Sequence, residues 1–367
     1  MFGNVPLQKP FVYISFYVSD RIAEAMATRT TPDEKETSRV SAFTAIRIDQ
    51  DEAGYRAAYV ALDASELMDG DVDVEVTHST VNYKDGLAVT GKAPVVRRFP
   101  MIPGVDFAGV VTRSSHPNFR AGEQVIAGGC GLGEQHYGGF AQRARVSGDW
   151  LVHLPQGLTP AQAMAIGSAG YTAMLCVLAL EGRGLEPSRG PVIVTGAAGG
   201  VGSVAVALLA ALGWRVVAST GRPQEEAYLK ELGAAEIVDR AELSAPGKPL
   251  QKQRFAGGVD TVGSVTLANV LAQTAIDGVV AACGNAQGME LPTTVAPFIL
   301  RGVSLIGVES VRPNLPLRRA GWERLACDLD KGILARMTET APFSEALERA
   351  RSIVAGKIRG RLVIEIG

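Results

Sequence analysis

Cysteine and histidine are scarce in this chain of 367 residues. Its four cysteines, Cys130, Cys176, Cys283 and Cys327, are scattered and form no C-x-x-C pair. Such spacing excludes a disulfide framework and a four-cysteine zinc site, and it suits a reducing compartment. The four histidines are scattered as well, and nothing is spaced to supply the roughly three protein ligands of a catalytic metal. We therefore expect a cytoplasmic protein without a bound metal.

An excess of either charge is also missing. The 36 basic and 38 acidic residues nearly balance, so we expect no general attraction to nucleic acid or to an anionic membrane. No segment reaches about eighteen consecutive apolar residues, and we therefore predict no membrane span. The length exceeds one comfortable domain and favours two domains that share a cleft.

Glycine is abundant, and the most informative stretch of the sequence contains a cluster of it. In Pro191–Leu212 a short β-branched run ends at the glycines, and apolar residues then recur at helical spacing. This order predicts a strand, a tight turn and a helix whose N-terminus can hold a pyrophosphate against backbone N–H groups. The residues of this candidate dinucleotide site are Gly199, Gly200, Val201 and Gly202. A tight turn that binds nothing would show similar glycines.

The next strand, Trp214–Thr220, ends without the acidic residue that usually accepts a hydrogen bond from the ribose of NAD. Ser219, Thr220, Gly221 and Arg222 stand there instead. Hydroxyl groups and a guanidinium suit a 2′-phosphate, because arginine donates charge-assisted hydrogen bonds to phosphate oxygens. Arg240, after the next strand, can supply a second positive charge. The pattern favours NADPH, with solvated surface arginines as the alternative.

The rest of the chain predicts two architectures. Alternating strands and helices continue after Asp239 and indicate an α/β fold with a doubly wound parallel sheet, a Rossmann domain. Before it, short alternating strands from Ala42 onward indicate a smaller barrel-like β-rich domain. A helix begins at a capping box of Thr159 and Gln162 and is expected to break near Gly167.

We expect a poorly ordered extension at 1–41, with Met26 near an ordinary start. The catalytic domain is expected at 42–165, the cofactor domain at 166–311 and a return to the catalytic domain at 312–367.

Several motifs resemble one family closely, over residues 42–367. The arrangement is similar to the medium-chain dehydrogenase/reductase superfamily, in its zinc-free quinone-oxidoreductase-like branch, and most of all to the NADPH-dependent acryloyl-CoA reductases. The motifs that carry the resemblance are VNYKDGLAVTGK (81–92), RFPMIPGVDFAG (98–109), GEQHYGGF (133–140), AGYTAMLC (169–176), TGAAGGVGS (195–203) and LPTTVAPFILR (291–301).

The resemblance implies a GroES-like catalytic domain and the reduction of acryloyl-CoA to propanoyl-CoA. Hydride from NADPH would reach the β-carbon and a proton the α-carbon. It also implies a homodimer formed by edge pairing of the cofactor domains. Zinc-dependent relatives carry a Gly-His-Glu segment, whereas this chain has Gly104-Val105-Asp106 without the histidine, which again argues against a metal.

The candidate catalytic residues are Asn82, Tyr83, Lys84 and Asp85, where the superfamily has its active-site loop. Tyr83 is expected to contact the nicotinamide or to donate a hydrogen bond to the enolate, and Asn82 to act as a neutral donor, while the sequence does not indicate which residue protonates the α-carbon. Lys84 can help by its charge, and Asp85 can orient it. Alternatively, Asn82 and Asp85 form a turn through bonds to the backbone, and Tyr83 is a core aromatic.

Further cofactor contacts are expected at Thr172 and after two later strands, since ligands in open α/β sheets lie at the carboxyl ends of strands. These positions are Gly284, Asn285, Gly307 and Val308. Core packing explains Thr172 equally well, and Cys283 is interpreted as a small buried hydrophobic residue. His136 and Tyr137 are candidates for the substrate mouth. Lys92, Arg97 and Arg98 are candidates for the CoA phosphates, unless they are simply solvated.

Two other functions fit the same residues. The first is an NADPH-dependent reductase of quinones or small enones, which the motif VNYKDG and the missing metal ligands fit as well. The second is a non-catalytic NADPH-binding protein with a structural or sensory role.

Overall fold

The computed structural model describes residues 42–312 and 314–367. The extension expected at 1–41 lies outside these residues. The described part begins with an antiparallel hairpin of β1 (Phe43–Asp51) and β2 (Gly54–Leu62), which are the first of the short strands predicted from Ala42 onward.

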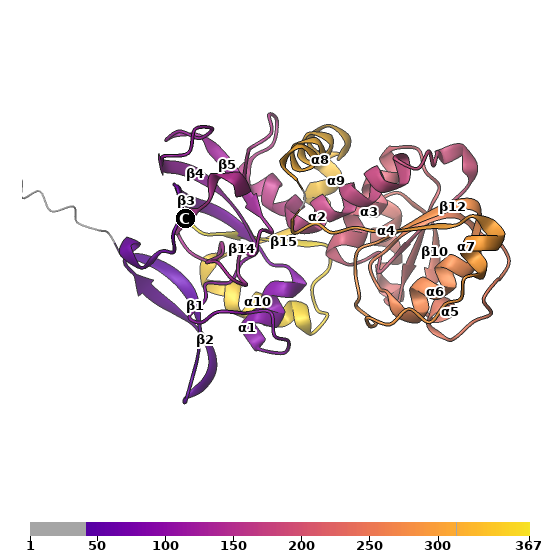
Figure 1. Cartoon of the computed structure of the whole chain (residues 1–367), viewed down its shortest axis with the longest axis horizontal. Helices are drawn as coiled ribbons and strands as arrows, with labels where there is room; N and C mark the ends of the chain where they lie inside the picture. Colours follow the sequence, from indigo (N-terminus) through magenta and orange to yellow (C-terminus); the bar gives the residue numbers. More distant parts are fainter. Residues whose placement is uncertain (1–41, 313) are drawn as a thin grey trace, which may run out of the picture. The chain divides into compact units, whose positions relative to one another are not determined.

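A seven-stranded sheet consists of strands from the first half of the chain and from its last segment (Figure 1). The strand order is β14-β15-β3-β4-β5-β7, and β6 also pairs with β3. The last strand, β15, pairs with β3, so the C-terminal segment returns to this sheet. The strands are β3 (Val72–Thr80), β4 (Asp106–Ser114), β5 (Gln124–Gly128), β6 (Arg143–Val146), β7 (Leu151–His153), β14 (Thr338–Pro342) and β15 (Arg361–Glu365).

A six-stranded parallel sheet follows in the order β10-β9-β8-β11-β12-β13. This is the order of a Rossmann fold, and it confirms the predicted fold class. Strand β8 is the predicted β-branched run before the glycines, and β9 ends at Thr220 as predicted. The strands are β8 (Val192–Thr195), β9 (Val216–Thr220), β10 (Ala234–Asp239), β11 (Phe255–Asp260), β12 (Thr274–Ala282) and β13 (Ser304–Gly307).

The helices cover these sheets and connect them (Figure 1). Three of the elements were not predicted from the sequence: the helices α1 and α9 and the strand β14. The helices are α1 (Tyr83–Thr90), α2 (Pro160–Glu181), α3 (Gly200–Ala211), α4 (Glu226–Glu231), α5 (Ala241–Ser244), α6 (Ser264–Gln273), α7 (Ala296–Arg301), α8 (Leu315–Asp328), α9 (Lys331–Arg336) and α10 (Ala346–Val354).

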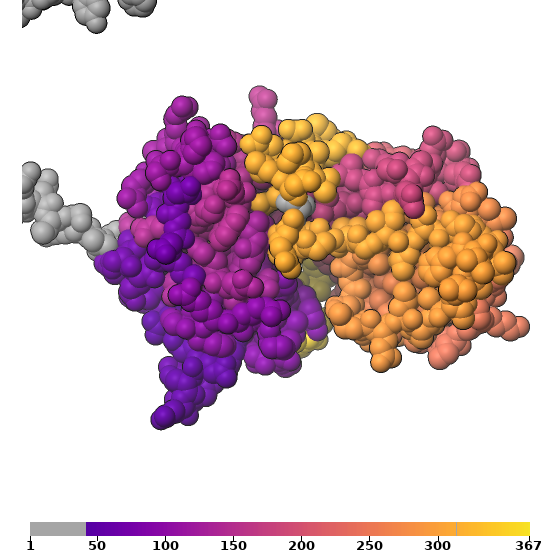
Figure 2. Space-filling view, in the orientation of Figure 1, coloured from indigo at the N-terminus to yellow at the C-terminus, as the bar shows by residue number. Residues whose placement is uncertain are grey.

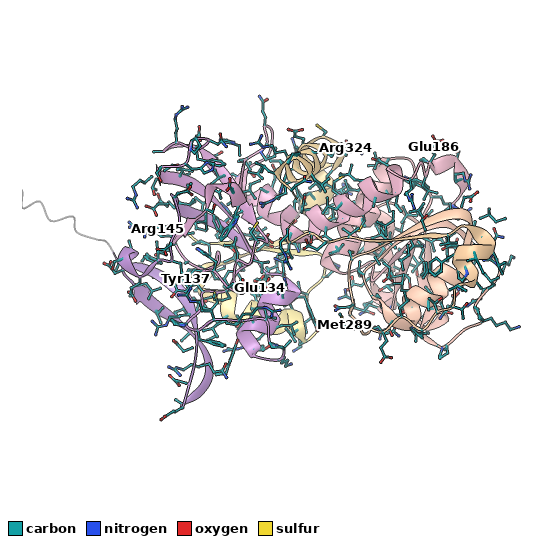
Figure 3. All side chains as sticks on the ribbon, viewed as in Figure 1. Glu134, Tyr137, Arg145, Glu186, Met289 and Arg324 are labelled. Atoms are coloured by element: carbon teal, nitrogen blue, oxygen red, sulfur yellow. The ribbon has the colours of Figure 1, made fainter. Side chains whose placement is uncertain are left out.

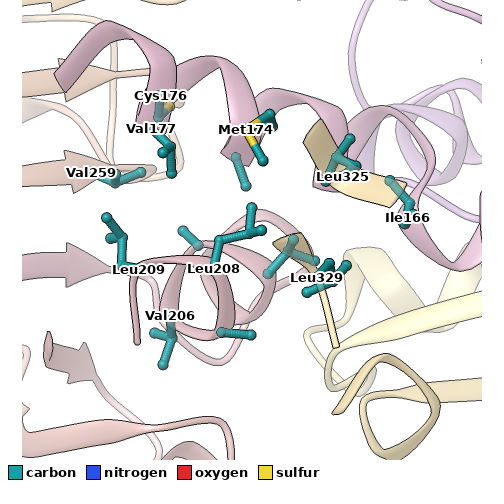
Figure 4. Packing of buried hydrophobic residues seen from close by; sticks show 14 of the residues in the cluster. Ile166, Met174, Cys176, Val177, Val206, Leu208, Leu209, Val259, Leu325 and Leu329 are labelled. Atoms are coloured by element: carbon teal, nitrogen blue, oxygen red, sulfur yellow. The ribbon is translucent and has the colours of Figure 1, made fainter. Parts of the chain in front are cut away.

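Helix α2 is the central element of the largest apolar core. Its side chains pack against α3, α8 and the parallel sheet, as Figure 4 shows for Met174 of α2 and Leu208 of α3. The predicted capping box is present, because Thr159 accepts from Gln162 N and Gln162 accepts from Thr159 N. The helix is long and apolar enough to cross a membrane, but 83% of its apolar 18-residue segment is buried within the protein, as in a core helix.

The predicted break in α2 falls at Gly167, with φ 51° and ψ −164°. A side chain there would collide with its surroundings, since a Cβ would lie 2.7 Å from Arg361 Nη2 and 2.9 Å from Thr80 Cγ2. Glycine therefore lets α2 turn against the strands β3 and β15. The break brings Ser168 and Thr172 to the edge of the site described next.

Candidate functional site

A cavity of about 1310 Å³ opens between the parallel sheet and the seven-stranded sheet. Figure 2 shows the surface hollowed between the indigo-to-magenta part and the orange part. One wall consists of the β8–α3 turn and the carboxyl ends of β9 to β12. The other wall consists of the start of α1, the break in α2 and the segment from α10 to β15. The volume exceeds that of an ordinary small-molecule pocket, which rarely passes about 1,000 Å³.

Most of the predicted residues line this cavity. They are Asn82, Tyr83, Lys84, Thr172, Gly199, Gly200, Val201, Ser219, Thr220, Gly221, Arg222 and Arg240. The roles assigned to them stay predictions, but the fold brings them together from five separate segments.

Six predicted residues do not line the cavity: Asp85, Gly202, Gly284, Asn285, Gly307 and Val308. Two of them are glycines for packing reasons. A Cβ on Gly202 would lie 2.3 Å from Gly196 O, and one on Gly284 would lie 2.2 Å from Thr261 O. After β12 and β13 the cavity is lined instead by neighbouring residues that sequence reasoning did not single out as cofactor contacts, namely Cys283, Ala286, Gln287, Ser310 and Val311.

The glycine turn presents the N-terminus of α3 to the cavity. Gly199 is the N-cap and makes no side-chain cap, so the first N–H groups of this helix are available to an anion. Arg361 adds a positive charge at the same place, because its Nη1 lies 2.9 Å from where a Gly200 Cβ would be. A pyrophosphate fits this combination of helix end and guanidinium.

The two arginines predicted to bind a 2′-phosphate are placed differently. Arg222 Nη2 donates to Ala198 O at 2.8 Å, and its Nη1 donates to Ile358 O at 3.4 Å. Arg240 packs over Gly221, where a Cβ would lie 2.2 Å from Arg240 Nε. Within residues 42–312 and 314–367, the Arg240 side chain has no hydrogen-bond or ion-pair partner, so its guanidinium is free for a phosphate.

The polar segment predicted as a loop is instead the start of helix α1. Asn82 is the N-cap, and Asp85 Oδ2 accepts from Asn82 N at 2.8 Å. Asp85 Oδ1 accepts from the backbone N–H groups of Gly104 and Val105. Asp85 is fully buried, and burial raises the pKa of its carboxyl to about 7. Asp85 therefore binds the backbone, which was the structural alternative.

One prediction was that Asp85 orients Lys84. The structure differs, because Lys84 pairs with another carboxylate. Its Nζ lies 2.7 Å from Glu134 Oε1, and Figure 3 labels this glutamate beside α1. Tyr83 is not a core aromatic either, because 55% of it is exposed. Its side chain is free to meet a ligand in the cavity.

A buried polar network behind Asn82 was not predicted. Asn82 Nδ2 donates to Asp106 Oδ2 at 2.7 Å, and Arg361 Nη1 donates to Asn82 Oδ1 at 3.3 Å. Ser168 N also donates to Asp106 Oδ2, at 2.9 Å. Burial lowers the pKa of Arg361 to about 10. One signal was visible in the sequence: a single arginine stands directly before the apolar run LVI of the strand RLVIE.

The donor set near Asp106 does not suit a metal. Asp106 is occupied by Asn82 and Ser168, and Asp85 by backbone N–H groups. In the part of the chain that the structure describes, no three His, Cys, Asp or Glu side chains are grouped to hold a metal ion. Metal independence of the chemistry stays a prediction.

The remaining candidates divide between the cavity and other places. Thr172 Oγ1 donates to Ser168 O at 2.6 Å and lies 2.8 Å from Ser310 Oγ, so it links α2 to the segment after β13. His136 is nearly buried, and its ring contacts Asp69 O. His136, Tyr137, Lys92, Arg97 and Arg98 do not line the cavity, contrary to the role suggested for the first two at the substrate mouth.

Comparison with known proteins agrees with this architecture. Residues 68–156 match the alcohol dehydrogenase GroES-like domain, and residues 200–320 match the zinc-binding dehydrogenase family. The chain belongs to the medium-chain dehydrogenase/reductase superfamily.

Individual relatives are more specific. The chain is 50% identical to the probable acrylyl-CoA reductase AcuI of Escherichia coli (strain K12), over 88% of this chain and 99% of the relative. It is 48% identical to the acrylyl-CoA reductase AcuI of Ruegeria pomeroyi, again over 88% and 99%. The crystal structure of the YhdH oxidoreductase from Salmonella enterica in complex with NADP has a TM-score of 0.87 at 50% identity, covering 88% of this chain and all of that one.

Proposed function

We propose that this protein uses NADPH to reduce the carbon–carbon double bond of acryloyl-CoA, giving propanoyl-CoA. The observation that carries the proposal is the cavity itself. It joins a Rossmann glycine turn and a free arginine at one end to Tyr83 and Asn82 at the other. The named activity of the two relatives, each matched over nearly its full length, supplies the substrate.

The residues present fit a bound NADPH. The α3 N-terminus and Arg361 would hold the pyrophosphate, and Ser219, Thr220 and Arg240 would hold the 2′-phosphate. Arg222 would brace the glycine turn through its bonds to Ala198 and Ile358. When bound, the cofactor supplies the hydride.

The protein has to polarise the thioester and deliver a proton. Negative charge gathers on the thioester oxygen as the β-carbon is reduced, and donors fixed beforehand stabilise it. Asn82 has one N–H committed to Asp106, so its second N–H is available for that oxygen. The Tyr83 hydroxyl, exposed to the cavity, is the group we assign to protonation of the enolate.

The decisive experiment measures NADPH oxidation by the purified protein with acryloyl-CoA, beside NADH and beside a simple quinone. We expect a kcat/KM for NADPH with acryloyl-CoA far above that of the other two combinations. Activity with quinones alone would overturn the thioester substrate and support the quinone or enone reductase. Tight NADPH binding without turnover of any acceptor would instead support the non-catalytic alternative.

We also propose that the protein is a homodimer in the cytoplasm. Strand β13 forms an open edge of the parallel sheet, and such edges pair readily with another strand. Exposed apolar side chains lie on the elements beside it: Ile276, Met289, Leu291, Val295, Ile299 and Leu300. Met289 projects from the loop that follows β12 (Figure 3).

All four cysteines are free thiols, as suits a reducing compartment. The domain boundaries expected from the sequence stay part of this proposal.

A further inference from the structure

Asp106 is a buried carboxylate behind the wall of the cavity. It begins β4 and is 1% exposed. Its Oδ2 accepts from Asn82 Nδ2 at 2.7 Å and from Ser168 N at 2.9 Å, and its Oδ1 accepts from the Ser168 hydroxyl. Asn82 and Ser168 line the cavity, whereas Asp106 does not. Asp106 therefore affects a ligand only through these neighbours.

The orientation of the Asn82 amide follows from the chemistry of its two partners. The Asp106 carboxylate only accepts hydrogen bonds, and the guanidinium of Arg361 only donates them. Asn82 Nδ2 therefore faces Asp106, and Asn82 Oδ1 faces Arg361 Nη1 at 3.3 Å. A reversed amide would set acceptor against acceptor at one end and donor against donor at the other. One of the two N–H groups of the amide remains, and it belongs to a side chain that lines the cavity.

Close packing also holds the Asp106 carboxylate in place. A Cβ on Gly128 would lie 2.5 Å from Asp106 Oδ1, and one on Gly167 would lie 3.1 Å from Asp106 Oδ2. Glycine at both positions leaves room for the carboxylate, and the positive φ of Gly167 brings the Ser168 N–H to it. The Ser79 hydroxyl donates to the backbone oxygen of Asp106 at 2.7 Å. The carboxylate is thus fixed before any ligand arrives.

We propose that Asp106 positions Asn82 for the reaction, so that an N–H group and not the amide oxygen faces the thioester oxygen of the substrate. The inference rests on the proposed function, in which Asn82 donates to that oxygen. A reversed amide would present its own oxygen to an atom that gathers negative charge, and it would repel this charge instead of stabilising it. Because the charge gathers during hydride transfer, the contribution of Asp106 belongs to kcat rather than to KM.

The first test compares two substitutions of Asp106 in kinetics with acryloyl-CoA and saturating NADPH. Asp106→Ala removes the acceptor, so we expect kcat to fall about 100-fold, as on loss of one oxyanion donor, and KM to stay within about threefold. Asp106→Asn keeps an oxygen that accepts from Asn82, and kcat should stay within about fivefold, the difference between a charged and a neutral acceptor. Equal losses in the two variants would assign the effect to the charge of Asp106 and overturn the proposal, as would an unchanged kcat in Asp106→Ala.

A double substitution tests whether Asp106 acts through Asn82. Asn82→Ala alone should lower kcat about 100-fold, and adding Asp106→Ala should change it further by less than about twofold, because the amide to be positioned is gone. A second loss of similar size would show an independent role of Asp106 and overturn the proposal. Ser79→Ala removes only the bond to the Asp106 backbone oxygen. It is the control and should keep kcat within about twofold.

If Asp106→Ala does not fold, an exchange of the two side chains decides the matter. Asn82→Asp combined with Asp106→Asn keeps a hydrogen bond between an amide and a carboxylate, but it turns an acceptor toward the substrate. We expect this double variant to keep its Tm within about 5 °C and to lose kcat about 100-fold or more. A folded double variant with an unaltered kcat would overturn the proposal.

A measurement without any ligand separates this inference from the proposed function. Side-chain ¹⁵N NMR of Asn82, assigned with Asn82→Ala, follows the solvent exchange of the two amide protons. We expect the proton bound to Asp106 to exchange at least about tenfold more slowly than the other, and the difference to disappear in Asp106→Ala. Equal exchange of both protons in the unaltered protein would overturn the inference even if acryloyl-CoA is turned over. Unequal exchange without any turnover of NADPH and acryloyl-CoA would instead overturn the proposed function.

Discussion

At the scale of single residues, the two arginines near Gly221 differ in their contacts. Arg222 has donors committed to the backbone of Ala198 and Ile358, while the guanidinium of Arg240 has no partner among the described residues. The sequence predicted that both arginines bind the 2′-phosphate. It could not show which of the two side chains is already held by other residues. The structure favours Arg240 as the residue that distinguishes NADPH from NADH.

We therefore expect Arg240→Ala to raise the KM for NADPH and to leave that for NADH nearly unchanged. Loss of a hydrogen bond to a charged group costs about 1.5–3 kcal/mol, which corresponds to roughly 10- to 150-fold. Steady-state kinetics with both cofactors measures the effect. Arg215→Ala, an exposed arginine paired with Glu236, is the matched control and should change neither value. Equal losses with both cofactors would contradict this assignment.

Tyr83 offers a second test at this scale. If its hydroxyl protonates the enolate, Tyr83→Phe should lower kcat by about 100-fold, within the range of general acid catalysis. The KM for NADPH should stay within about twofold, because the ring remains in place. Tyr137→Phe, outside the cavity lining, should keep full activity. An unchanged kcat in Tyr83→Phe would remove the hydroxyl from the mechanism.

At the scale of elements, α1 depends on the buried carboxyl of Asp85. The spacing of Asn82 and Asp85 is that of a capping box, and the structure forms it. The sequence reading missed the helix because its first residues are polar, but the spacing of the cap was visible. What could not be read locally is that Asp85 also holds the backbone at Gly104 and Val105.

Burial raises the pKa of Asp85 from 3.8 to about 7, which gives stability a defined pH dependence. The folded protein binds this proton more tightly than the unfolded chain. The stabilisation is thus complete below about pH 4 and is lost as the pH rises through about 7. Asp85→Asn cannot ionise, so its Tm should fall less than that of the unaltered protein between pH 4 and 8. Asp63→Asn, at the exposed cap of a short 3₁₀ helix, is the control and should not reduce the fall in Tm. If Tm falls equally with pH in Asp85→Asn and in the unaltered protein, the expectation is wrong.

The break in α2 makes a prediction about backbone conformation. Gly167→Ala places a side chain at positive φ and against Arg361 and Thr80, so we expect a loss of about 2–4 kcal/mol in unfolding free energy. Gly184→Ala has a positive φ as well, but its Cβ would meet nothing within 4 Å. The control should cost only about 1–2 kcal/mol. Urea unfolding measures the free energy of unfolding of both variants. Similar losses in the two would contradict the prediction, because they would show that the neighbours of residue 167 move aside at little cost.

At the scale of the whole molecule, the order of strands and helices was largely predictable, and the buried part of the site was not. Strands such as β8 and β9 are short apolar runs that end at glycine or polar residues, and this pattern is local. The contact between Asn82 and Arg361 joins residues 279 positions apart, and no local pattern indicates it. Likewise, Gly284 follows a strand of the parallel sheet, where a ligand contact is expected from the sequence. Its backbone instead packs closely against Thr261, and no local pattern indicates that contact.

The proposed dimer is tested at this scale. Ile299 of α7 is 72% exposed beside the open edge of the sheet, so Ile299→Asp would bury a charge in the proposed interface. We expect this variant to be monomeric by light scattering at concentrations where the unaltered protein is dimeric. Leu317→Asp, an exposed apolar residue on α8, should remain dimeric. A monomeric unaltered protein would contradict the proposal directly.

The long-range contact of Arg361 has a consequence for how the protein is made. A ribosome that has reached β13 has already translated the glycine turn, α1 and both arginines near Gly221. Arg361, however, still has to be translated, and without it Asn82 lacks its guanidinium partner and β3 lacks its neighbour β15. Nascent chains that stop short of this residue are thus expected to emerge without a complete nucleotide pocket. Cofactor capture would be one of the last events in biosynthesis, after most of the parallel sheet has had time to fold.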